Sequence, residues 1–325
     1  MMHTLLAAWL MSAQVTPAEN HGAHGDAPGL IGQARRLVED HGDAVWPGIS
    51  TAPFGILLID SDTERLFCHP GTPGGFEAAG PDAATGCDYS ERPAVFPPNL
   101  LASFPAVEGK PTVVIGTPAA TGRDPDAWVL TIAHEHFHQM QFAMPGYYGG
   151  IDALELSGGD ESGLWMLNYP FPYDRPETSK AFSALAAALV AALDSRGTDA
   201  FAASLASYWQ AREAARETVS NADWRYVELQ LWQEGVARWT EQAIGAYSET
   251  LASAAMQARE RTRTELHGLD LARQGRVALY PIGAAEAMLL DAAGTAWRGI
   301  YWSEPFALGP LLRRLVTASS LTGAP

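Results

Sequence analysis

Basic residues are scarce in this chain of 325 residues: 21 Lys and Arg stand against 37 Asp and Glu, a formal net charge of -16. Nucleic acids and anionic lipid surfaces are bound through basic surface, so this balance disfavours both as partners. Apolar stretches are also short, and we expect no stable insertion into a membrane. Motifs of several enzyme classes are missing as well: there is no GxSxG, no GxxxxGK, and no GxGxxG that opens a helix after a strand.

Cysteine is rarer still, with only Cys68 and Cys87. Both lie in a Gly- and Pro-rich region, 68–98, which shows neither helical nor strand periodicity and which we expect to be a long surface excursion. In an oxidising compartment the two thiols would readily pair and tether this loop, and two free thiols in a cytosolic protein are the alternative. No CxxC spacing indicates redox or metal chemistry.

The N-terminus resembles a short secretory signal. An apolar stretch at 5–11 is followed by Ser12-Ala13-Gln14, a small-residue cleavage signature. No Lys or Arg precedes it, and a disordered start is the alternative. We expect a possible signal peptide at 1–16 and a flexible lead-in at 17–30. Together with the cysteine pair, this favours a secreted or periplasmic protein, with a cytoplasmic location as the alternative.

Apolar residues make up 47% of the chain, and their arrangement predicts an α+β fold. Compact apolar runs at 54–60 and 112–116 indicate buried strands, and hence a small sheet. Helices are expected near 31–41, 125–143, 179–193, 200–216, 224–244, 249–267 and 281–293. We therefore predict an N-terminal α/β part at 31–150, a mostly helical part at 151–325, and a cleft between them.

The predicted helix at 125–143 carries an HExxH motif that runs from His134 through Glu135 to His138. Residues four apart lie on one face of a helix with Cβ atoms about 5–6 Å apart, so the two imidazoles can bind one metal ion. Glu135 is turned by about 100° and is better placed to reach a metal-bound water. His136, about 200° from His134, should point away from the metal. A structural cluster of hydrogen-bonded histidines is the alternative.

A catalytic zinc site needs a third protein ligand, and the best candidate is Glu234 on the predicted helix 224–244. HExxH followed by the Trp-x-Glu-Gly-x-Ala segment around Glu234 resembles the gluzincin metallopeptidases, the group that includes thermolysin-like and aminopeptidase N-like enzymes. This resemblance implies that His134, His138 and Glu234 hold one zinc ion per chain, with Glu135 as the general base.

Two further residues are candidates through the same resemblance. Tyr280, just before Pro281 at a predicted helix start, resembles the downstream tyrosine that stabilises the oxyanion in related peptidases; a buried packing tyrosine is the alternative. Arg238 stands where some relatives carry an acid that orients a ligand histidine. That role could fall to Glu241 instead, and an exposed carboxylate without a role is the alternative.

These residues together predict a zinc-dependent hydrolase, and most specifically a metallopeptidase that acts on peptides or proteins. A non-catalytic binding or structural module that holds zinc in a peptidase-like fold is the alternative. A zinc hydrolase that acts on other substrates would use the same residues.

Overall fold

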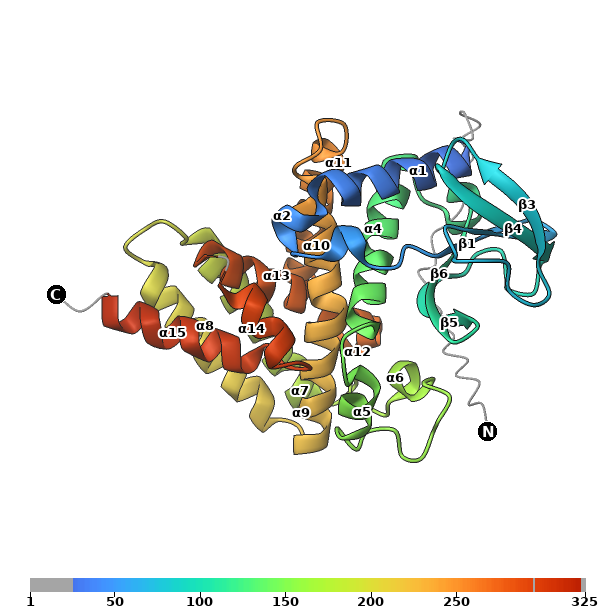
Figure 1. The fold of residues 1–325 in the computed structure, drawn as a ribbon. Coiled ribbons are helices and arrows are strands. Elements are labelled where there is room, and N and C mark those ends of the chain that lie inside the picture. The colour runs from blue at the N-terminus through green and yellow to red at the C-terminus, as the bar shows by residue number, and fades with distance from the viewer. Residues whose placement is uncertain (1–25, 295, 323–325) are drawn as a thin grey trace. The chain divides into compact units, whose positions relative to one another are not determined.

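The computed structural model describes residues 26–294 and 296–322, and it has the expected α+β architecture (Figure 1). The predicted signal peptide at 1–16, and residues 17–25 of the predicted lead-in, lie outside the described residues. The described chain divides into two compact units. The first contains the residues up to Tyr148, Ser157–Asn168 and Thr240–Met256, and the second contains Gly149–Leu156, Tyr169–Trp239 and the residues from Gln257 onward. The parts expected from the sequence were continuous, whereas these units are interleaved.

A six-stranded mixed sheet lies in the first unit, in the order β3-β4-β2-β1-β6-β5. Neighbouring strands are antiparallel except for β1 and β6, which are parallel. The apolar runs predicted to be strands form this parallel pair inside the sheet, and their residues are buried on both faces, which explains the absence of alternation. The strands are β1 (Ile56–Asp60), β2 (Thr63–Phe67), β3 (Glu77–Asp82), β4 (Cys87–Pro93), β5 (Leu101–Val107) and β6 (Lys110–Gly116).

The prediction that 68–98 lacks regular structure is wrong, because β3 and β4 form a hairpin there that extends the sheet beyond β2. Most residues of β3 and β4 are exposed or half-buried, so their sequence carries no apolar period. Backbone pairing orders them: β4 pairs with β2, and β3 pairs with β4 with an irregularity in register between Ala78 and Gly80. Cys68 and Cys87 form the disulfide bond considered above, with their Cα atoms 5.0 Å apart.

Helices make up most of the remaining described chain. The helix predicted at 31–41 begins earlier, at Ala27, because Pro28 suits a first helical turn, so Ala27 to Leu30 are not a flexible lead-in. The α-helices are α1 (Ala27–Leu37), α2 (Asp43–Val45), α3 (Pro118–Thr121), α4 (Pro125–Phe142), α5 (Tyr147–Asp152), α6 (Trp165–Asn168), α7 (Pro176–Asp194), α8 (Phe201–Glu217), α9 (Asn221–Gln230), α10 (Val236–Gly245), α11 (Ala252–His267), α12 (Leu271–Gln274), α13 (Leu279–Ala292), α14 (Trp297–Ser303) and α15 (Gly309–Thr322). Short 3-10 turns lie at η2 (Ile49–Thr51) and η4 (Gly275–Ala278), and π turns at η1 (Val38–Gly42) and η3 (Leu231–Gly235).

Helix α4, which carries HExxH, packs against β5, β6 and α1 in the first unit. At its start the Asp124 side chain accepts a hydrogen bond from the backbone N–H of Ala127 at 2.9 Å, as predicted for a capping carboxylate. The Trp128 indole donates to the carbonyl of Gly116 at 2.9 Å. Near the motif, the Ser103 hydroxyl of β5 donates to the carbonyl of Glu135 at 2.8 Å. The backbone of the HExxH turn is therefore fixed relative to the sheet.

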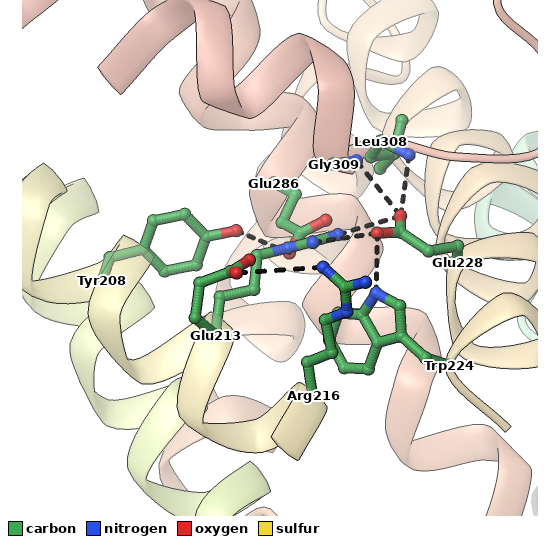
Figure 2. Close-up of polar contacts among 9 residues, drawn as sticks. Tyr208, Glu213, Arg216, Trp224, Glu228, Glu286, Leu308 and Gly309 are labelled. Carbon is green, nitrogen blue, oxygen red and sulfur yellow. Dashed lines mark hydrogen bonds and ion pairs between the residues drawn. The ribbon is translucent and has the colours of Figure 1, made fainter. Parts of the chain in front are cut away.

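The second unit buries a charged network that joins α8, α9 and α13 (Figure 2). Arg212 donates to both carboxylate oxygens of Glu228 at 2.9 Å, and also to Oε1 of Glu286 at 2.9 Å. The Tyr208 hydroxyl donates to the same Glu286 oxygen at 2.6 Å. All four side chains are buried, so the charge of Arg212 is balanced inside the protein rather than by solvent.

The two carboxyl groups of this network differ in their preferred protonation state. Burial would raise the pKa of Glu228, but the charge and hydrogen bonds of Arg212, together with the backbone N–H groups of Gly309 and Leu308, outweigh burial and lower that pKa. Burial raises the pKa of Glu286, and Arg212 only partly offsets this effect. Compared with the same groups in water, the surroundings therefore favour the ionised form of Glu228 and the protonated form of Glu286.

This difference predicts opposite outcomes for two matched substitutions. Glu228→Gln leaves the Arg212 charge uncompensated and should lower the free energy of unfolding by about 3–5 kcal/mol. Glu286→Gln imitates the protonated side chain and should cost much less. Because the folded pKa of Glu286 is raised above its ordinary value of 4.5, its contribution to stability is present below that value and declines as pH rises. In urea unfolding, the penalty of Glu286→Gln should therefore be larger at about pH 5 than at about pH 8. Equal penalties for the two variants would contradict this assignment.

Candidate metal centre

Three buried side chains form a group that could hold a metal ion: His134, His138 and Glu234. Their exposed fractions are 5%, 1% and 1%, respectively. One ligand atom from each side chain can be chosen so that all three atoms lie within 4.8 Å of one another. These are the three residues that the sequence motifs select as ligands.

The two histidines of α4 face each other through Nε2. These two nitrogen atoms are 3.2 Å apart. Two nitrogen ligands bound to one zinc ion at about 2.0–2.1 Å in tetrahedral geometry are separated by about 3.3–3.4 Å. The observed separation therefore suits a metal ion shared by the two rings.

The outer nitrogen of each ring has an acceptor. Nδ1 of His138 lies 2.6 Å from Oε1 of Gln141, and Nδ1 of His134 lies 3.3 Å from a carboxylate oxygen of Glu241. A proton on Nδ1 that is donated to these oxygens leaves the lone pair of Nε2 available to a metal and fixes the plane of the ring. Glu241 thus makes the contact considered for it from the sequence, while Arg238 forms an ion pair with Glu265 at 2.7 Å.

Gln141 was not identified from the sequence. Its signal is the spacing of three residues from His138 on the same helix, which brings the two side chains together along one face. Glutamine is common on helices, so this spacing indicates a metal site only after the ligand histidines are known.

His136 points away from the group, in agreement with its expected direction. Its Nδ1 is 2.8 Å from Oε1 of Gln139, and its Nε2 is 3.0 Å from the carbonyl oxygen of Ile49. Burial lowers the pKa of His136 although both hydrogen bonds favour the charged ring. Gln139 also donates to the carbonyl of Gly55 at 2.8 Å. This side of the motif therefore anchors α4.

Glu135, the predicted general base, lies between the ligand histidines in the sequence and is 4% exposed. The hydrogen bond from Ser103 to its carbonyl holds its backbone. The Glu135 carboxylate is thus buried, as are the two candidate ligand imidazoles. Electrostatic interactions in such a buried site are stronger than in bulk water.

Glu234 lies in the π turn η3, which joins α9 and α10 into one helical run. This run matches the helix predicted at 224–244, but the π turn was not predicted because one widened turn hardly changes apolar periodicity. Helix α13 approaches the turn very closely: a Cβ added to Gly235 would lie 2.4 Å from Cα of Gly283. The two glycines therefore allow α13 to pack directly against the turn that carries Glu234.

Tyr280 is the second residue of α13 and is 2% exposed. The helix begins at Leu279, two residues before the expected start, because Pro281 is tolerated within a first turn. The Tyr280 hydroxyl accepts a hydrogen bond from Arg276, a residue that the sequence motifs did not select. The spacing of four residues between Arg276 and Tyr280 is the only signal of this pair in the sequence.

No protein-family model matches this chain, and no curated protein or solved structure matches it significantly.

The geometry predicts about one metal ion per chain in the purified protein, measured by elemental mass spectrometry. His138→Ala and Glu234→Ala should each weaken binding strongly, because each removes a ligand. Glu241→Gln should lower the affinity by about 10–100-fold, because it removes the anionic acceptor of His134 while leaving the ligands in place. His267→Ala is a matched control, because His267 is exposed and lies outside the group. If the control and the ligand variants bind metal equally well, the site is assigned incorrectly.

Proposed function

We propose that this protein is a zinc-dependent hydrolase, and most specifically a metallopeptidase of the gluzincin type. The observation that carries the proposal is the buried group of His134, His138 and Glu234, with the two Nε2 atoms facing each other. Two imidazole nitrogens and one carboxylate oxygen form a donor set that suits zinc and leaves a coordination position for water. One zinc ion per chain is expected.

The chain supplies the other groups that hydrolysis of a peptide bond requires. Zinc held by His134, His138 and Glu234 would act as a Lewis acid and would lower the pKa of a water bound to it to about 7. Glu135 accepts a proton as the water oxygen bonds to the carbonyl carbon, and it returns the proton to the leaving nitrogen as the C–N bond breaks. Tyr280 donates a hydrogen bond to the former carbonyl oxygen while that atom carries negative charge.

We also propose that the protein acts outside the cytoplasm, on peptide or protein substrates. The Cys68–Cys87 disulfide bond is compatible with an oxidising compartment. None of the helices among the described residues is long and apolar enough to cross a membrane.

The proposal predicts that Glu135→Gln keeps its zinc and loses hydrolytic activity. Removal of the general base should lower kcat by at least about 100-fold, because general acid-base catalysis contributes about 10²–10⁴-fold. Activity would be followed on a library of fluorogenic peptides, with zinc content determined on the same samples. Glu265→Gln, which removes a carboxylate paired with Arg238, is the control and should remain active. A wild-type protein that binds zinc but cleaves no peptide would instead support a non-catalytic zinc-holding module.

A second substitution tests the donor to the oxyanion. Tyr280→Phe should leave the zinc content unchanged and lower turnover about tenfold or more, because only the hydrogen bond to the charged oxygen is lost. Steady-state kinetics on a peptide that wild type cleaves would measure this effect. An unchanged kcat would remove Tyr280 from the mechanism and leave it as a packing residue.

A further inference from the structure

Arg276 determines how the Tyr280 hydroxyl forms hydrogen bonds, because it donates to the hydroxyl oxygen. It lies in η4, just before α13, and its guanidinium donates to the Tyr280 oxygen. The Cζ atom of Arg276 is also 5.4 Å from the centroid of the Tyr280 ring. Arginine has donors and no acceptor, so in this contact the tyrosine oxygen can only accept. The hydrogen of the Tyr280 hydroxyl must therefore be directed to a different atom.

Burial opposes the charge of Arg276, but the neighbouring hydroxyl of Tyr280 and the carboxylate of Glu234 outweigh burial, and the pKa of the guanidinium is raised. Arg276 therefore lies within electrostatic reach of both the candidate ligand Glu234 and the predicted oxyanion donor Tyr280. Arginine stays protonated in proteins, so Arg276 does not lose this charge by deprotonation.

Three tyrosines of the second unit, Tyr169, Tyr173 and Tyr226, contact one another, and two of them lie near Arg276. The Tyr173 hydroxyl donates to the Tyr226 hydroxyl at 3.3 Å, and the ring of Tyr226 stacks on that of Tyr169 with centroids 4.3 Å apart. Tyr169 in turn donates to a carboxylate oxygen of Asp223 at 3.0 Å, and burial, followed by this carboxylate, raises the pKa of Tyr169 to about 12. Burial also raises the pKa of Tyr173 and Tyr226, so the hydroxyl groups beside Arg276 stay protonated.

We propose that Arg276 is a positioning residue that commits Tyr280 to donating its hydroxyl hydrogen to the oxyanion of the substrate. The inference rests on the proposed function, because it assigns Arg276 a role in the same reaction. A cation bound to the acceptor side of a hydroxyl polarises the O–H bond and strengthens it as a donor. The effect is largest when the partner oxygen carries negative charge, that is, in the transition state. Arg276 thus acts on turnover through Tyr280 and not by binding the substrate.

A double-mutant cycle tests this inference with Arg276→Gln, Tyr280→Phe and the double variant, all as zinc-loaded protein. Arg276→Gln should lower kcat by about tenfold with KM changed by less than about twofold, because the lost interaction strengthens only in the transition state. In the Tyr280→Phe background, the same substitution should have almost no further effect. Arg276→Lys should restore part of the loss, because lysine is also a cationic donor. Arg273→Gln is the matched control, since Arg273 lies exposed on the preceding helix.

Two results would overturn the inference. Independent, multiplicative effects of the two substitutions, or an increased KM in both backgrounds, would mean that Arg276 binds the substrate directly. Loss of zinc in Arg276→Gln would mean that Arg276 serves Glu234 rather than Tyr280.

A binding measurement separates failure of this inference from failure of the proposed function. A phosphinic peptide carries a charged tetrahedral group that imitates the oxyanion, and its affinity can be measured by calorimetry without turnover. Arg276→Gln should weaken its binding only when Tyr280 is present. If the wild-type protein neither binds the phosphinic peptide nor cleaves peptides, the proposed function itself fails, and the role of Arg276 fails with it. If wild type does both and the cycle is additive, only the role of Arg276 is wrong.

Discussion

The pair of imidazoles on α4 imposes the constraint on which the rest of the candidate site depends. Two rings buried with their Nε2 atoms 3.2 Å apart lose hydration, and this loss is costly unless a cation or hydrogen bonds offset it. The acceptors at Gln141 and Glu241 satisfy the outer nitrogens and set the direction of the inner ones. The other anchors of α4, at Ser103 and Gly116, hold the backbone so that these directions persist. Polar contacts far from the ligand atoms therefore determine what the ligand atoms can bind.

In the second unit, one pair of helices links the site residues to the stability of the fold. Helix α9 carries Glu228 and leads directly into the turn of Glu234, while α13 begins at Tyr280's turn and carries Glu286. Arg212 joins the two carboxyl groups, so the buried charge network fastens the same two helices that present Glu234 and Tyr280. The close approach of Gly235 and Gly283 brings α13 into direct contact with the turn that carries Glu234. Positioning of the functional groups and burial of charge are thus parts of one packing arrangement.

The fold class and the three metal-binding candidates could be predicted from the sequence because each has a local signature. Continuous apolar runs mark β1 and β6, which lie inside the sheet, and the spacing of His134 and His138 marks one helix face. The β3-β4 hairpin could not be predicted, because its order comes from pairing with β2 and its side chains are mostly exposed. Arg276 and Gln141 were missed for a different reason: each is noticed through its contact with a residue whose importance must be known first.

The π turn at η3 has a consequence for how this helix can change during evolution. A π turn is equivalent to one residue inserted into an α-helix, and each residue corresponds to about 100° of rotation. Because the widened turn takes up the extra residue without rotating the helix that follows, deletion of one residue from Leu231–Gly235 would give a regular helix in which Glu241 keeps its direction relative to the residues before the turn. The direction of Glu234, which lies inside the turn, would change. The Glu234 carboxylate and the Glu241 carboxylate that contacts His134 would then no longer point in their present directions relative to each other. The widened turn therefore sets the angular register between the third metal-binding candidate and the acceptor of the first, and insertions or deletions should be tolerated far less here than in the surface turns of the same chain.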